Sequence, residues 1–337
     1  MSAAESLVLP AQLRVDYVNA APGELLAAAD TLAVFAFGSD APAHDDPRYR
    51  RVGLQPRGPA PLEIWRGQGP VAHGRDGDIA WSEDGALQFG AIELDEPGLA
   101  TGESDIEATA AEVYARLVAF TRARGYPHIL RMWNYLDGIT HGDGDDERYR
   151  RFCVGRARGL GEFDPHALPA ATAVGRSDDA RRLLVYWLAA RTPGTPLENP
   201  RQTAAYRYPR QYGPQPPSFA RGMLPASASM PLLISGTAAV VGHESRHAGN
   251  VGAQLEETLT NLDTLLATAH ARRPNVPRQL GAGTHLKVYV RERDEIEAVE
   301  QLLRQRLDPA VRFIVLHSAI CRRELRVEID GTQGSAD

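Results

Sequence analysis

One short stretch of the sequence, from His243 to His247, matches the H-E-x-x-H pattern of zinc peptidases. In those enzymes a helix brings both imidazoles to one face, with the glutamate beside them as general base. Here Gly242 and Gly249 bracket the pattern, and the nearest convincing helix begins only near Asn250. No obvious third ligand follows. We therefore expect a loop and no metal, and a zinc hydrolase is the weakest of the functional alternatives.

Arginines and tyrosines gather in nonhelical, proline-bounded segments, where they could bind a ligand. Arginine forks hold carboxylates in a bidentate manner and phenols add hydrogen bonds, so the combination suits a small anionic, partly apolar molecule. Lys287 is the sole lysine among 37 basic residues, so almost every available cation is an arginine. Alternatively, these residues have no role in ligand binding, with the arginines on the surface and the tyrosines packed between domains. The candidates are Arg131, Asn134, Tyr135, Tyr206, Tyr208, Arg210, Tyr212 and Arg221.

The composition excludes several classes of protein. With 337 residues, 43% hydrophobic and 24% charged, the chain reads as a globular protein with room for two domains. The net charge of -6 argues against a nucleic-acid partner. No apolar run is long enough for a membrane span and the N-terminus lacks a signal pattern, so we expect a cytoplasmic protein without a membrane partner. Cys153 and Cys321 are too few for a disulfide scaffold, and reduced buried thiols are expected.

The pattern along the chain predicts two similar halves. Residues 191–230 are rich in proline, glycine, tyrosine and arginine, which precludes a long helix and favours a structured connection. On either side the order is a strand, a long amphipathic helix and a second strand, which suggests a diverged repeat. We therefore expect an N-terminal domain over 1–190, a connection over 191–230 that contributes to the site, and a C-terminal catalytic domain over 231–337.

Helical periodicity and capping signals place the two long helices. The first begins near Ser104, where Ser104 and Glu107 form a capping-box pattern, and the second begins near Asn250. In the second half a further amphipathic segment and two strands follow. In the last of these, Leu325, Val327 and Ile329 alternate with Arg326, Glu328 and Asp330, which predicts one covered face and places the second set on the exposed face. The expected fold is α+β, with two domains that each have a mixed sheet packed by helices on one face.

Several motifs resemble known families. The stretches LISGTAAVVGHES, VYVR and CRRELRVEIDG make residues 230–331 similar to the RidA (YjgF) family of small trimeric proteins. Together with RMWNYLDGI, RYRRFCVGRARGL and YRYPRQYGPQPPSFARG, they make the whole chain resemble the chorismatases, which are fused two-domain relatives of RidA-like proteins. This resemblance implies cleavage of chorismate with release of pyruvate and without a metal or organic cofactor.

The resemblance also implies roles for particular residues. Glu328 matches the catalytic glutamate of the family, and chorismate cleavage needs an acid that protonates the enolpyruvyl methylene carbon. Burial would raise the pKa of this glutamate and neighbouring arginines would lower it, and the sequence does not decide between them. The two substrate carboxylates need arginines. The candidates are first Arg291, then Arg131 and Arg156, and then Arg210 or Arg221.

The product is a second implication of the resemblance. Members that form 3-hydroxybenzoate resemble this chain in having a cysteine seven residues before the glutamate, here Cys321, and small residues at Ala238 and Ala239 also bear on product choice. Some relatives also make 4-hydroxybenzoate, feeding pigment and ubiquinone synthesis. A RidA-type enamine or imine deaminase, or a small-anion-binding protein, is the main alternative. A homotrimer and a monomer both remain open.

Overall fold

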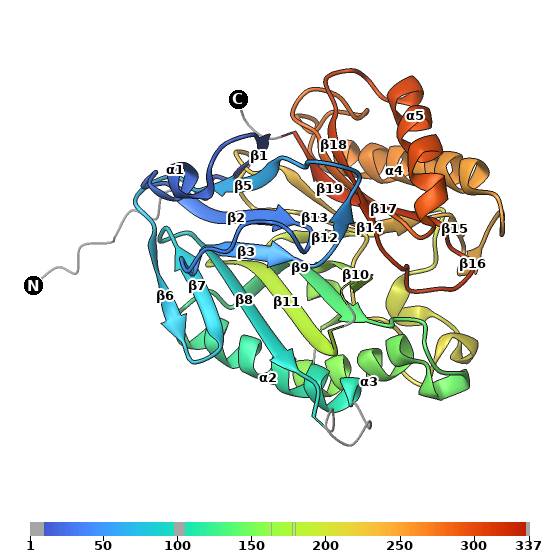
Figure 1. The fold of residues 1–337 in the computed structure, drawn as a ribbon, viewed down its shortest axis with the longest axis horizontal. Coiled ribbons are helices and arrows are strands. Elements are labelled where there is room, and N and C mark those ends of the chain that lie inside the picture. Colours follow the sequence, from blue (N-terminus) through green and yellow to red (C-terminus); the bar gives the residue numbers. More distant parts are fainter. Residues whose placement is uncertain (1–9, 98–104, 163, 177, 179, 335–337) are drawn as a thin grey trace, which may run out of the picture.

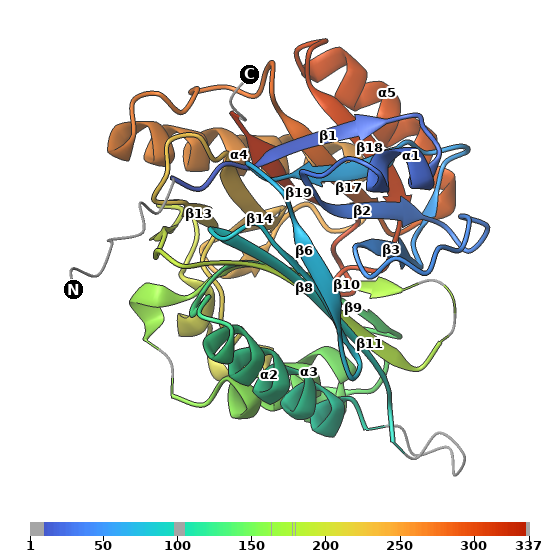
Figure 2. The same ribbon diagram turned by 90° about the vertical axis from the view of Figure 1, so that its left-hand side faces the viewer.

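The computed structural model describes residues 10–97, 105–162, 164–176, 178 and 180–334. Within these residues the chain forms two large mixed sheets, one smaller sheet and a short hairpin, with helices on the outer faces (Figure 1). Figure 2 shows the two pairs of long helices at opposite ends of the molecule, with the sheets between them. None of the helices in the described part of the chain is long and apolar enough to cross a membrane.

The first large sheet is covered on one face by the helices α2 (Ile106–Ala123) and α3 (Arg148–Leu160). Apolar side chains of α2 such as Val113 and Leu117 pack against the sheet, as helical spacing requires. The strands in spatial order are β10 (Ala170–Arg176), β9 (His128–Asp137), β11 (Arg182–Ala190), β8 (Leu87–Asp95), β7 (Ile79–Glu83) and β6 (Ala72–Asp76).

The second large sheet is covered in the same way by α4 (Val251–Arg272) and α5 (Ile296–Arg306). Its central pair β14 and β19 shifts register between Ile234 and Thr237, which marks a bulge at this point of β14. The strands in spatial order are β12 (Thr195–Leu197), β13 (Gly222–Leu224), β14 (Leu232–Ala238), β19 (Val327–Gln333), β17 (His285–Val290), β18 (Arg312–His317) and β4 (Gln55–Pro56).

The helix-free faces of the two large sheets meet in a central core. Side chains of β9, β11, β14 and β17 share one apolar cluster, which includes Trp133, Tyr186, Leu233 and Tyr289. The smaller sheet closes a further side of this core and carries the helix α1 (Pro22–Leu26). Its strands in spatial order are β1 (Arg14–Val18), β5 (Leu62–Arg66), β2 (Thr31–Phe37) and β3 (Tyr49–Val52).

The structure confirms the expected α+β fold class and the placement of the second long helix. Asn250 caps α4, because its side chain accepts a hydrogen bond from the Ala253 amide. The first long helix begins at Ile106 and is capped by Asp105, whereas the predicted cap Ser104 lies outside the described residues. The order strand, helix, strand recurs as β8, α2, β9 and as β14, α4, β17.

Two expectations about the second half need correction. The last strand begins at Val327, so Leu325 lies in the preceding loop. The alternation placed Glu328 and Asp330 on the same face, but this face is buried, because the first large sheet covers it. The domain boundaries at 190 and 230 stay a prediction, since β12 and β13 of the connection, and β4 near the N-terminus, all pair into the second sheet.

The H-E-x-x-H stretch forms a short hairpin of β15 (Val240–Val241) and β16 (Glu244–Ser245), not a helix. The two imidazoles bind different neighbours. His243 lies 3.3 Å from the hydroxyl of Tyr212, and His247 lies 3.1 Å from a carboxylate oxygen of Glu257. The spacing therefore does not bring the two histidines together as it does on a helix.

Candidate active site

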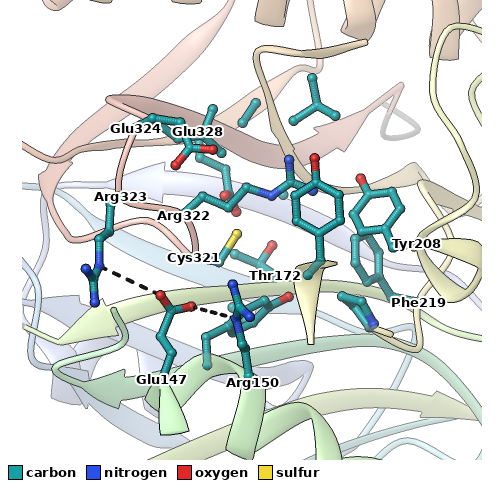
Figure 3. A pocket seen from close by; sticks show the side chains of 18 of the residues that line it. Glu147, Arg150, Thr172, Tyr208, Phe219, Cys321, Arg322, Arg323, Glu324 and Glu328 are labelled. Carbon is teal, nitrogen blue, oxygen red and sulfur yellow. Dashed lines mark ion pairs between the residues drawn. The ribbon is translucent and has the colours of Figure 1, made fainter. Parts of the chain in front are cut away.

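A cavity of about 480 Å³ opens where the two large sheets meet, beyond the ends of β10 and β14. Its volume lies in the range of small-molecule sites. The walls come from all three parts of the chain: Arg156 of α3 and Thr172 of β10, Tyr212 and Arg221 of the connection, and Glu328 of β19. Figure 3 shows side chains from both halves converging on this space. A ligand bound here would contact both halves at once.

Glu328 lies in a slot of the second sheet. It pairs with Ala238 across the β14–β19 ladder, next to the bulge of β14, and is 5% exposed. The slot exists because residue 236 is glycine: a Cβ atom at Gly236 would lie 2.1 Å from Oε1 of Glu328. The described residues donate no hydrogen bond to the carboxyl, which borders the cavity.

Burial raises the pKa of Glu328 to about 8, and the negative charge of Asp330 acts in the same direction. The positive charges of Arg131, Arg221 and Arg291 oppose this shift without cancelling it. The carboxyl is therefore mostly protonated at neutral pH. A protonated carboxyl that faces a cavity can act as a general acid.

Arg156 and Arg221 supply two buried guanidinium groups to the cavity wall, exposed by 3% and 5%. Arg156 donates through Nη2 to the carbonyl oxygen of Ser218, at 2.8 Å. Arg221 donates to the hydroxyl of Tyr208, at 2.7 Å, and to the carbonyl oxygen of Thr203, at 2.9 Å. The Nε atoms of both arginines are buried and have no hydrogen-bond partner among the described residues. Because both guanidinium groups line the cavity, they favour an anionic ligand there.

Charged side chains also surround the mouth of the cavity. The Glu147 carboxylate lies between Arg150 and Arg323, at 3.8 Å from each, as the dashed lines in Figure 3 show. Arg322 stacks over the ring of Tyr212, with 4.0 Å between the guanidinium carbon and the ring centroid. These contacts tie the start of α3 to the loop after β18.

Cys321 lines the cavity from the loop that follows β18. This loop is fixed to the first sheet, because Ile320 forms a bridge with Val174 of β10. Burial raises the pKa of the Cys321 thiol well above its usual range, and the charge of Glu328 adds to the effect. The group therefore stays a neutral thiol. Cys153 is buried in the core behind α3, where burial raises its pKa to about 12.

The structure places half of the predicted site residues at the cavity and half elsewhere. Those in the cavity wall are Glu328, Cys321, Arg156, Tyr208, Tyr212, Arg221 and Ala238. Those outside it are Arg131, Asn134, Tyr135, Tyr206, Arg210, Arg291 and Ala239.

The residues outside the cavity wall have other partners. Arg291 donates to the carbonyl oxygens of Ile320, Arg322 and Leu325, so it holds the Cys321 loop in place instead of facing the cavity. Arg131 is completely buried and pairs with Asp330 at 3.2 Å.

The remaining residues outside the cavity lie in the core or on the surface. The hydroxyl of Tyr135 lies in the core, 3.0 Å from that of Tyr186, and Ala239 is fully buried. Arg210 is exposed and binds the carboxylate of Asp145 through two nitrogens. Tyr206 is half-buried and contacts the neighbouring Arg207.

Several cavity residues were not anticipated. Thr172 carries no recognisable pattern, whereas Phe219 and Arg150 lie within two of the family-like motifs but were not singled out there. Arg322 and Arg323 directly follow Cys321, so the proximity of two arginines to the predicted thiol was a usable signal.

Known proteins resemble this chain in both sequence and structure. Residues 63–189 match the family described as chorismatase FkbO/Hyg5-like, N-terminal. A chorismatase from Streptomyces hygroscopicus is 40% identical over 278 residues, which cover 80% of this chain and 78% of the relative. A 3-hydroxybenzoate synthase from the same organism is 34% identical over 282 residues, covering 80% of each protein.

A solved structure is similar to this chain over nearly its whole length. A chorismatase crystal structure superposes with a TM-score of 0.84 and 33% identity, covering 96% of this chain and 98% of the other. Together with the sequence matches over four-fifths of the chain, this similarity settles the family. The chain belongs to the chorismatase family.

Proposed function

We propose that this protein converts chorismate to 3-hydroxybenzoate and pyruvate, with Glu328 as the general acid. The chorismatase and the 3-hydroxybenzoate synthase from Streptomyces hygroscopicus support this substrate and product, since both are similar over 80% of the chain. The observation that carries the proposal is the Glu328 carboxyl, whose pKa is raised to about 8 beside a cavity that also presents arginines. An acid and anion-binding groups are what the reaction requires.

The cavity wall matches the charge of chorismate, which is a dianion with one ring carboxylate and one enolpyruvyl carboxylate. The guanidinium groups of Arg156 and Arg221 are buried there and retain nitrogen donors without partners among the described residues. Each could hold one carboxylate and so orient the enol ether toward Glu328. Phe219 and Tyr149 add apolar surface for the ring.

The reaction follows as a proton cycle. Glu328 gives its proton to the methylene carbon of the enolpyruvyl group, which leaves an oxocarbenium-like centre. The bond between the ring carbon and the ether oxygen then breaks with its electron pair on oxygen, and pyruvate leaves. The neighbouring ring hydroxyl captures the ring cation as an epoxide-like intermediate, which opens, loses one proton and becomes aromatic. The Glu328 carboxylate takes a proton back, so the two products contain all atoms of chorismate and no co-reactant is needed.

Cys321 is placed to influence the product. It lines the cavity beside Glu328, and its pKa is raised, so it acts as a neutral thiol and not as a thiolate nucleophile. We assign to this thiol the guidance of the epoxide-like intermediate to 3-hydroxybenzoate. Ala238 belongs to the same part of the cavity wall, and its small side chain leaves the ring room to approach.

Incubation of the metal-free protein with chorismate tests the proposal, with pyruvate assayed and the ring products resolved by chromatography. We expect pyruvate and 3-hydroxybenzoate from the wild type. Glu328→Gln should lose at least about a hundredfold in rate, since removal of a general acid costs that much. The matched control is Glu244→Gln, which changes an exposed glutamate on β16 and should leave the rate unchanged.

Other outcomes would decide against chorismate. If no pyruvate forms and imines are hydrolysed, the RidA-type deaminase is correct. If added zinc restores activity that chelation removes, the zinc hydrolase is correct. The fraction of 4-hydroxybenzoate, the homotrimer or monomer, and the cytoplasmic location stay predictions from the sequence.

A further inference from the structure

Asp330 is a buried carboxyl two residues after Glu328 on β19, and its own contacts are unusual. Its Oδ2 atom accepts hydrogen bonds from Thr172 Oγ1 at 2.7 Å, Tyr289 OH at 2.8 Å and Trp133 Nε1 at 3.1 Å. The Asp330 side chain has no exposed surface. These three donors fix the position of the carboxyl, whose Oδ1 atom is buried and has no hydrogen-bond partner among the described residues.

Two cations and a second carboxyl complete a buried charge cluster. Arg131 Nη2 lies 3.2 Å from Oδ2 of Asp330, and Lys287 Nζ lies 3.8 Å from its Oδ1. Lys287 also pairs with Glu63 at 3.0 Å, and all four side chains are at most 3% exposed. In this cluster of Asp330, Arg131, Lys287 and Glu63, two carboxyl side chains thus lie against two basic side chains, which gives each buried charged group a partner of opposite sign.

The cluster reaches the cavity through Thr172. Thr172 donates to Asp330, accepts a hydrogen bond from Arg131 and lines the cavity with Glu328. Its methyl group borders the slot at Gly236 that holds the Glu328 carboxyl. Alternate residues of a strand point to the same face, about 7 Å apart along it, so the charge of Asp330 acts on Glu328 from close range.

We propose that Asp330, held in place by this cluster, is a positioning residue for the proton of Glu328, and that Arg131 limits the strength of its effect. The inference rests on the proposed role of Glu328 as the acid. It deepens that role, because it identifies the groups that decide whether the acid carries its proton at neutral pH.

Several charged or titratable groups face Glu328, and their balance supports this inference. Asp330 raises the pKa of Glu328 and the three arginines lower it. Arg131 is already paired with Asp330, and Arg291 is bound by three backbone carbonyls, so neither is free to approach the carboxyl. The groups are Asp330 of β19, Arg131 of β9, Arg221 next to β13, Arg291 after β17, Tyr149 of α3 and Cys321 of the loop after β18.

The test compares variants with opposite expected effects. Asp330→Asn removes the negative charge and keeps the shape, and Arg131→Gln removes the positive charge. Arg131→Lys is the control that conserves charge. For each, the rate of pyruvate formation from chorismate is measured against pH, and an infrared difference spectrum between the parent and its Glu328→Gln counterpart follows the protonated carboxyl directly.

The expected results differ in sign. Asp330→Asn should move the alkaline midpoint of both titrations down by about one pH unit, which lowers the rate at pH 8 about fivefold beyond any loss at acid pH. Arg131→Gln should move both midpoints up, and Arg131→Lys should leave them near the parent value.

Each outcome supports or overturns the inference. Equal midpoints in all variants, even with reduced rates or melting temperatures, would show that the cluster is merely structural. If Asp330→Asn does not fold, the comparison of Arg131→Gln with Arg131→Lys still tests the inference, because only Arg131→Gln should move the pH midpoint upward. A wild type that releases no pyruvate refutes the proposed function instead, and the infrared titration of Glu328 then tests the cluster on its own.

Discussion

Replacement of the Glu328 carboxyl by an amide should stabilise the folded protein at alkaline pH and have no such effect in acid. The pKa of Glu328 in the folded protein is about 8, above its ordinary value of 4.5. Between these two values the folded protein keeps a proton that the unfolded chain releases. The free energy of unfolding of the wild type therefore falls as pH rises through this window. The amide of Glu328→Gln does not titrate, so residue 328 no longer lowers the free energy of unfolding as pH rises.

The structure gives the size of the effect. Moving the pKa from 4.5 to about 8 corresponds to about 5 kcal/mol, at about 1.4 kcal/mol for each pH unit. Because Glu328 is only 5% exposed, solvent screens little of this energy. This is a large part of the stability of an ordinary domain, which is about 5 to 15 kcal/mol.

Urea unfolding of both proteins at several pH values between about 5 and about 9 measures the difference. The gap between Glu328→Gln and the wild type should grow in favour of the variant by about 3 to 5 kcal/mol over this range. Glu24→Gln, which alters an exposed residue of α1, should run parallel to the wild type. If the Glu328→Gln curve is also parallel, Glu328 is ionised in the folded protein and the assignment of a buried neutral acid is wrong.

Three further predictions concern the cavity. Cys321→Ala should keep pyruvate release and lower the share of 3-hydroxybenzoate among the ring products, as measured by chromatography. Cys153→Ala, the control, should not change that share. Arg221→Lys should raise the KM for chorismate about tenfold, because a lysine ammonium group cannot form the two parallel hydrogen bonds of a guanidinium group. An equal rise in Arg210→Lys, which changes an exposed arginine, would contradict this prediction. Gly236→Ala should lower kcat about a hundredfold or more, since the added Cβ would lie 2.1 Å from the carboxyl of Glu328 and displace it. An unchanged kcat would show that the position of the carboxyl does not depend on the glycine at residue 236.

The sequence was sufficient to locate elements that have a local signal. Asn250 caps α4 as predicted, and the alternation around Val327 and Ile329 placed Glu328 on the correct face of its strand. Alternation states which side chains share a face, but it does not state what covers that face. Glu328 is buried because a sheet from the other half of the chain packs over it, and this long-range contact leaves no trace in the local pattern.

The sequence was less able to predict which arginines line the cavity, since residue type does not reveal which acceptors a guanidinium group will reach. Arg291 and Arg131 both belong to strand segments near the site, yet one is bound by backbone carbonyls and the other by Asp330. Arg156 and Arg221 line the cavity, and they keep donors free because their neighbours satisfy only part of each fork. The difference arises from tertiary partners, which the spacing of arginines along the chain does not encode.

The two-sheet arrangement explains how one site can combine a neutral carboxyl with cationic groups. An acid with a pKa near neutrality needs a poorly solvated position, whereas a dianionic substrate needs guanidinium groups that would ionise a nearby acid. Here Glu328 lies in a slot of one sheet, backed by the anionic Asp330, while Arg156 and Arg221 reach the cavity from other elements. In the proposed site, the arginines assigned to the substrate and the carboxyl assigned to the proton of Glu328 thus come from different elements. Holding the acid in this state lowers the stability of the fold as pH rises from about 4.5 to about 8, and the aromatic core shared by the two sheets must offset that loss.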